Sequence, residues 1–146
     1  MRSALVAILI LSALCGAAAA DPVAEGLAFF REYERRSAQF DASLTELYAD
    51  DALIRSRRVT GSTTREMSFR GDQWKQMIKL AMPVAKMRGD TNSYSNVSAR
   101  QSGGDVIVAA QRYSELKRYT SPLTLVLRKS REGAWRIVEE RSETQP

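Results

Sequence analysis

The stretch from Pro122 to Glu143 constrains the fold more than any other part of the chain. It reads PLTLVLRKSREGAWRIVEERSE, in which two runs with alternating apolar residues flank Arg131-Glu132-Gly133. Alternation with period two is typical of a half-buried β-strand, and a three-residue loop with glycine in the left-handed position joins antiparallel strands. We therefore predict a closing β-hairpin in which Ser130 lies opposite Ala134.

This loop predicts a register for the whole hairpin. Counting outward gives the pairs Lys129–Trp135, Leu127–Ile137, Leu125–Glu139 and Leu123–Arg141. A two-residue turn at Thr120-Ser121 would add the pairs Leu127–Ser114, Leu125–Leu116 and Leu123–Arg118. The apolar face then becomes polar at one end, around Arg118, Glu139 and Arg141. A bulge in either strand would reverse the facing of these residues.

The rest of the chain predicts an α+β domain of about residues 21–146. A helix from Asp21-Pro22 carries apolar residues at spacings of three and four and is broken or re-capped near Asp41. Strands follow at 53–60 and 65–69, and a second helix from Gln73 to about Met87 should kink or end near Ala81 because of Pro83. Four later runs, at 94–101, 105–119, 122–130 and 134–142, predict an antiparallel meander.

The first 20 residues predict a secretory signal peptide. A basic start, an apolar run from Ala4 to Leu14 and Ala18-Ala19-Ala20 before Asp21 match such a leader, with cleavage after Ala20. The apolar run is shorter than the roughly 20 residues that a membrane-spanning helix needs. We expect export to a bacterial periplasm, and lipid attachment at Cys15 is the less favoured alternative.

Composition excludes several kinds of chemistry. The chain has no histidine, and its one cysteine lies in the predicted leader. A serine–histidine–aspartate triad, a cysteine nucleophile and the usual zinc sites are therefore excluded. After loss of Arg2 with the leader, 21 basic residues face 17 acidic ones, a mild excess that does not indicate nucleic-acid binding. We expect no cofactor and no metal.

The order of these elements resembles the nuclear transport factor 2-like superfamily, which includes ketosteroid isomerase and SnoaL-like domains. The most similar pieces are FDASLTELYADDALI at Phe40–Ile54 and GAWRIVEERS at Gly133–Ser142. The resemblance implies a cone-shaped α+β roll, in which a strongly curved, mostly antiparallel sheet wraps the N-terminal helices around an apolar pocket. It also implies a homodimer through the outer sheet face. Where many SnoaL-like proteins have histidines in the last strand, this chain has Glu139 and Arg141.

The candidate site follows from the predicted register and from this departure. Glu139 is the candidate general base, with Tyr113 or Tyr48 as a hydrogen-bond donor, and pairing of Glu139 with Arg141 or Arg118 is the structural alternative. Arginine residues could instead hold an acidic ligand by forked hydrogen bonds. The predicted ligand-binding residues are Arg112, Tyr113, Arg118, Glu139 and Arg141.

Three functions are consistent with these features. The first is an exported, non-catalytic domain that binds a small molecule in the cone pocket. The second is a histidine-free isomerase, dehydratase or hydrolase that uses a pocket carboxylate and a tyrosine. The third is a protein-interaction domain, favoured by apolar residues on both faces of the strand at Val106–Ala109.

Overall fold

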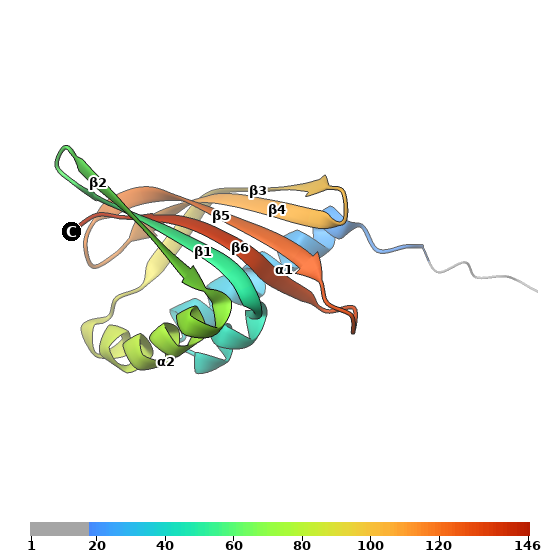
Figure 1. The fold of residues 1–146 in the computed structure, drawn as a ribbon, viewed down its shortest axis with the longest axis horizontal. Coiled ribbons are helices and arrows are strands. Elements are labelled where there is room, and N and C mark those ends of the chain that lie inside the picture. Colours follow the sequence, from blue (N-terminus) through green and yellow to red (C-terminus); the bar gives the residue numbers. More distant parts are fainter. Residues whose placement is uncertain (1–17) are drawn as a thin grey trace, which may run out of the picture.

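A computed structural model describes residues 18–146, and within them one sheet is covered on one face by helices (Figure 1). Most of the predicted leader lies outside these residues. The elements are α1 (Pro22–Ala38), the 3-10 helix η1 (Ala42–Leu47), β1 (Tyr48–Thr60), β2 (Thr63–Arg70), α2 (Gly71–Arg88), β3 (Asn92–Ser102), β4 (Asp105–Ser114), β5 (Tyr119–Lys129) and β6 (Trp135–Thr144). None of the helices in this part of the chain has the length and apolar character to cross a membrane.

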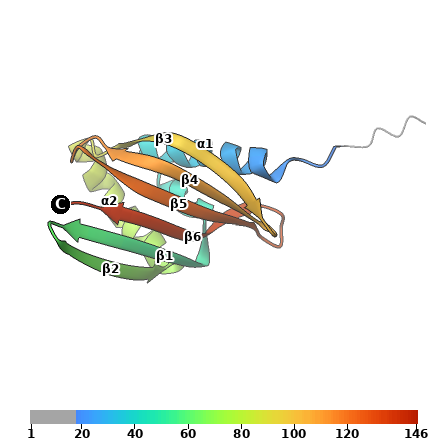
Figure 2. The same ribbon diagram turned by 90° about the horizontal axis from the view of Figure 1, so that it is seen from above.

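The sheet has six strands in the order β2-β1-β6-β5-β4-β3. All neighbouring strands are antiparallel except β1 and β6, which run parallel. The strands bend over the helices, and Figure 2 shows them fanned across one side of the molecule. The predicted α+β cone with a curved, mostly antiparallel sheet is confirmed.

The N-terminal helices end and restart where the sequence predicts. The carboxylate of Asp21 accepts from Val23 N at 3.0 Å and caps α1, whose first turn contains Pro22. After α1 the backbone of Phe40 takes a left-handed φ of 53°, and Asp41 then accepts from Ser43 N at 2.9 Å to start η1. This break turns the chain toward β1 and keeps η1 against the core.

Of the two expectations for Pro83, a kink or an end of the second helix near Ala81, the end is wrong. α2 continues through Pro83 to Arg88 and closes on Gly89 in the left-handed conformation. Pro83 removes the amide that would bond the carbonyl of Lys79, and both residues are exposed. Water can therefore solvate that carbonyl, and the helix tolerates the proline.

The closing hairpin has the predicted loop but only part of the predicted register. Gly133 has a φ of 82°, Ser130 N donates to Ala134 O at 2.8 Å, and Leu127 lies opposite Ile137. Beyond that pair, a bulge at position 138 shifts the pairing. The remaining partners are Val126–Glu139, Leu125–Glu140, Thr124–Arg141 and Leu123–Ser142.

The predicted two-residue turn at Thr120-Ser121 is also wrong. β4 ends at Ser114, a turn of residues 115–118 follows, and Arg118 N donates to Ser114 O at 2.8 Å. Arg118 itself has a left-handed φ of 59°. As a result the leucines of β5 face apolar residues of β4, in the pairs Leu123–Ala110, Leu125–Val108 and Leu127–Val106.

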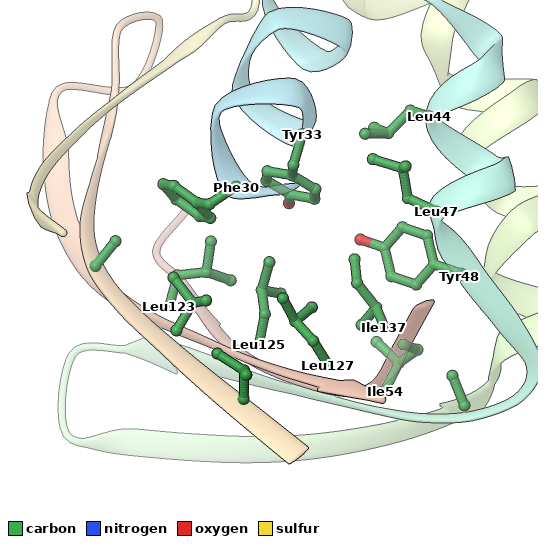
Figure 3. Close-up of a cluster of buried hydrophobic side chains, with 14 residues drawn as sticks. Phe30, Tyr33, Leu44, Leu47, Tyr48, Ile54, Leu123, Leu125, Leu127 and Ile137 are labelled. Carbon is green, nitrogen blue, oxygen red and sulfur yellow. The ribbon is translucent and has the colours of Figure 1, made fainter. Parts of the chain in front are cut away.

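The core lies between the inner sheet face and the helices (Figure 3). Leu125, Leu127 and Ile137 are completely buried, and Phe30 of α1 packs over them. Gly26 lets α1 approach the sheet closely, because a Cβ atom there would lie 2.5 Å from Val106 Cγ1. Burial of these apolar side chains is the main force that holds the helices on the sheet.

Candidate functional site

A cavity of about 390 Å³ lies between the helices and the inner sheet face. Its size falls in the range of small-molecule sites, roughly 300–1,000 Å³. Apolar and aromatic side chains of α1, η1 and α2 form most of its wall, and polar groups come chiefly from the strands. It is lined by Tyr33, Ser37, Phe40, Leu44, Tyr48, Trp74, Met77, Ile78, Ala81, Met82, Ala85, Asp90, Asn92, Arg112 and Glu140.

Glu140 is the buried acid of this cone cavity. It is 2% exposed and stands on the inner face of β6, between Leu125 of β5 and Ile54 of β1. The hydroxyl of Tyr48 donates to Glu140 Oε2 at 2.5 Å. Figure 3 shows Tyr48 with its hydroxyl turned into the core cluster rather than toward solvent.

Burial raises the pKa of Glu140 above its usual value of 4.5. Removal from water penalises the charged form of a carboxyl group, and this effect exceeds the opposing ones. The hydrogen bond from Tyr48, the positive charge of Arg112 and a hydrogen bond from Ser142 each lower the pKa and offset part of the rise. Glu140 is therefore protonated at a higher pH than a solvated glutamate.

Three tyrosines surround this acid and stay neutral. Burial raises the pKa of Tyr33 and Tyr48 well above 10, and it raises the pKa of Tyr94 to about 12. Tyr33 meets Tyr94 edge to face, with ring centroids 6.2 Å apart. The cluster thus supplies hydroxyl groups that can donate or accept hydrogen bonds without ionising at neutral pH.

Two further donors in the cavity wall are buried and form no hydrogen bond of ordinary geometry with residues 18–146, although an interaction of Trp74 with the Tyr48 hydroxyl offsets part of the rise that burial causes in the pKa of Tyr48. They are Nε1 of Trp74 and Nε of Arg112. Another nitrogen of Arg112, Nη2, donates to the Glu143 carbonyl at 2.5 Å and to Ser121 Oγ at 3.3 Å, which holds the guanidinium in place. An unpartnered buried donor costs about 1–3 kcal/mol, so both groups favour a ligand that brings acceptor atoms.

Of the predicted ligand-binding residues, Arg112 lines the cone cavity, and the other four lie outside its wall. Tyr113 is on the outer face of β4 and Arg118 is in the exposed turn after it. Glu139 and Arg141 are on the outer face of β6, where Arg141 Nε donates to Glu139 Oε1 at 2.8 Å. The predicted inward facing of Glu139 and Arg141 is wrong, whereas the alternative pairing of these two residues is confirmed.

A second cavity, of about 350 Å³, lies on the outer sheet face. It contains Arg141, together with Arg57, whose Nη2 donates to Glu143 Oε2 at 2.5 Å. The wall is formed by Arg55, Arg57, Glu66, Pro122, Thr124, Arg141, Ser142 and Glu143. Two of its arginines are thus already engaged by carboxylates, Arg57 by Glu143 and Arg141 by Glu139.

The sequence carried a signal for Glu140 that strict alternation conceals. The alternation of Trp135, Arg136 and Ile137 is interrupted because Val138 is also apolar, and a bulge is one way in which a strand accommodates such an extra residue. One extra residue at this point turns Glu139 outward and Glu140 inward. Trp74 also lines the cavity, and an apolar spacing pattern gives no information about the position of its indole nitrogen.

Comparison with known proteins shows the fold of this chain. Neither a protein-family model nor a curated protein sequence matches it. Among solved structures, a nuclear transport factor 2-like protein of unknown function from Pseudomonas putida KT2440 matches with a TM-score of 0.62 and 11% identity, over 82% of this chain and 84% of that one.

Two further solved structures are similar to this chain. A protein from Parabacteroides distasonis, named provisionally as a ketosteroid isomerase, has a TM-score of 0.54 and 16% identity, over 80% of this chain and 83% of that one. ActVI-ORFA from Streptomyces coelicolor has a TM-score of 0.57 and 10% identity, over 82% and 95%. The chain therefore has the nuclear transport factor 2-like fold that the sequence predicts.

Proposed function

We propose that the protein, which has this fold, binds a small, largely apolar molecule in the cone cavity without transforming it. The observation that carries the proposal is a set of buried polar groups, on Glu140, Tyr48, Trp74 and Arg112, within one cavity whose helical wall is mostly apolar. Apolar walls supply affinity by excluding water, and a few fixed polar groups set the orientation of the ligand.

The polar groups also define the chemistry of the ligand. Trp74 Nε1 and Arg112 Nε are donors, and a Glu140 carboxyl with a raised pKa is more readily neutral than one in water. A carbonyl or carboxylate group on an apolar body complements this set. The ligand is therefore proposed to be an apolar acid or ketone.

Paired variants test this proposal. Native mass spectrometry and calorimetry would screen aliphatic and aromatic acids and ketones against hydrocarbons of matched size. Glu140→Gln and Arg112→Gln should each weaken binding about tenfold, which corresponds to the loss of about 1.4 kcal/mol for one hydrogen bond to the ligand. Glu139→Gln and Arg141→Gln change the same residue types on the outer face and should bind as the wild type does. Equal effects of inner and outer variants would contradict the proposal.

Proton transfer is the second candidate function, and the raised pKa of Glu140 favours it. A general base works best when its pKa is close to the working pH, and Tyr48 could donate to a developing oxyanion. A bound ketone in deuterated water would be followed by NMR. Exchange of its acidic C–H protons in the wild type, lost in Glu140→Gln at ligand concentrations that saturate the variant, would establish catalysis. Absence of exchange supports a binding protein.

The place of action and the oligomeric state stay predictions. The leader at 1–20 supports export to a periplasm, and N-terminal sequencing of the exported protein should begin at Asp21. The outer sheet face carries half-buried Ile107, Ala109 and Val126, which supports a homodimer there. Light scattering that gives a monomer would contradict the dimer.

A further inference from the structure

The outer side of α2 carries an apolar stripe that no described residue covers. It consists of Met77 (42% exposed), Leu80 (79%), Val84 (45%) and Met87 (84%). Spacings of three, four and three residues place all four on one face of the helix. Figure 1 shows α2 at the side of the molecule away from the sheet. Four large apolar side chains over three turns are more than the scattered exposed residues that a protein surface normally has.

The same helix is strongly basic. It has four cations and one acid, Asp72, and among the cations Lys75 pairs with Asp50 at 2.6 Å. Within residues 18–146, Lys79, Lys86 and Arg88 form no ion pair. Lys79 and Lys86 are seven residues apart and so lie along one line beside the stripe, and Arg88 follows Met87 directly.

From this arrangement we propose that the stripe of α2 docks on the surface of an anionic lipid bilayer. A helix that lies in a membrane interface presents an apolar face to the acyl boundary and lysines or arginines to the headgroups. The stripe consists of exposed methionine, leucine and valine side chains, which a fluid surface can accept without a matching groove. The free cations beside it are complementary to anionic headgroups.

The docking surface adjoins the cone cavity. Met77 belongs to both, because it is part of the stripe and of the cavity wall, and Ala81 of the next turn also lines the cavity. When the protein is docked through α2, one wall of its cone cavity lies at the lipid surface. Apolar acids partition into that surface. A ligand could enter the cavity from the lipid surface past this wall. That entry route rests on the proposed function, whereas the docking itself does not.

Vesicle co-sedimentation tests the docking without any ligand. The chain from Asp21, which contains every described helix and strand, would be checked for cooperative thermal unfolding and mixed with vesicles of phosphatidylglycerol and phosphatidylcholine or of phosphatidylcholine alone. We expect binding to the anionic vesicles that weakens with added salt. The double variant Leu80→Gln/Met87→Gln should lose at least tenfold in affinity. Lys79→Gln/Lys86→Gln should lose roughly fivefold for each lysine.

The control is Leu116→Gln/Val97→Gln, which removes two exposed apolar side chains outside α2 and should bind as the wild type does. Because every variant site is exposed, folding should be retained. Failure of the wild type to bind anionic vesicles would overturn the proposal, as would unchanged binding by the Leu80/Met87 variant. A wild-type dimer that this variant dissociates would instead assign the stripe to a second copy of the chain and also overturn it. The cavity variants Glu140→Gln and Arg112→Gln should lose ligand binding and keep vesicle binding. Each of the two proposals can therefore be refuted without the other.

Discussion

Tyr48, the first residue of β1, donates its hydroxyl to Glu140 of β6 at 2.5 Å. The contact joins residues 92 positions apart in the chain and spans the parallel pair of strands at the centre of the sheet. It places the buried acid of the fold in the wall of the cone cavity. The position of the carboxyl group and its proton affinity both depend on this pair.

The stability of the protein should depend on pH through Glu140. A carboxyl group with a higher pKa in the folded protein than in the unfolded chain contributes stability that is fully present below the unfolded pKa, near 4.5. That contribution is lost as the pH rises through the folded pKa, at about 1.4 kcal/mol for each unit by which the two values differ. The free energy of unfolding of the wild type, relative to Glu140→Gln, should therefore fall as the pH rises above the unfolded pKa, near 4.5, and through the higher folded pKa.

Urea unfolding at a series of pH values measures this difference. Glu139→Gln removes a carboxylate from the outer face and is the matched control. One contrary result is a difference in unfolding free energy between the wild type and Glu140→Gln that does not change with pH. Another is a change in the pH dependence that is as large in Glu139→Gln as in Glu140→Gln. Either result would show that Glu140 is not the responsible group.

Removal of the Tyr48 hydroxyl should destabilise the protein. Tyr48→Phe leaves Glu140 Oε2 without its donor in a buried site, and an unsatisfied buried group costs about 1–3 kcal/mol. The pKa of Glu140 should rise further, because the lost hydrogen bond lowers it. Tyr119→Phe is the control, since Tyr119 is half-buried and its hydroxyl forms no side-chain hydrogen bond to residues 18–146. Equal unfolding free energies for the two variants would be inconsistent with the Tyr48 contact.

The start of α2 should accept no side chain. A Cβ atom on Gly71 would lie 2.0 Å from the Ala49 carbonyl oxygen and 3.0 Å from Ala52 Cβ. Gly71→Ala therefore forces the backbone of β1 and α2 apart, and we expect a loss of about 1–3 kcal/mol in the free energy of unfolding. At Gly104 a Cβ atom meets nothing within 4 Å, so Gly104→Ala should be nearly neutral. Thermal unfolding of both variants checks this, and a neutral Gly71→Ala would refute the close approach.

The arrangement of elements follows from local patterns in the sequence. The apolar periodicity of α1, the cap at Asp41 and the glycine of the closing loop each depend on residues a few positions apart, and the structure confirms all three. The pairing of Leu127 with Ile137 follows from that loop alone. Local sequence patterns are sufficient to predict the structure where the residues that determine it are neighbours in the chain.

The facing of Glu139 and Glu140 could not be obtained in the same way. Both residues are acidic, so residue type favours neither for the inner face, and the extra residue at Val138 decides between them. The pairing of β6 with β1 is also irregular at this level, because the pairs Tyr48–Ile137 and Leu53–Glu139 are five positions apart in β1 but only two positions apart in β6. The candidate site was misplaced by one residue because its position depends on contacts between distant segments.

Titration of the Glu140 carboxyl group by NMR tests the account most directly. With ¹³C-labelled glutamate, the carboxyl resonance that disappears in Glu140→Gln identifies the residue, and its chemical shift is followed against pH. We expect the Glu140 carboxyl group to have a pKa above the usual 4.5, and a still higher pKa in Tyr48→Phe. A pKa at or below 4.5 would contradict this expectation, because burial would then not outweigh the hydrogen bonds and the Arg112 charge that lower the pKa.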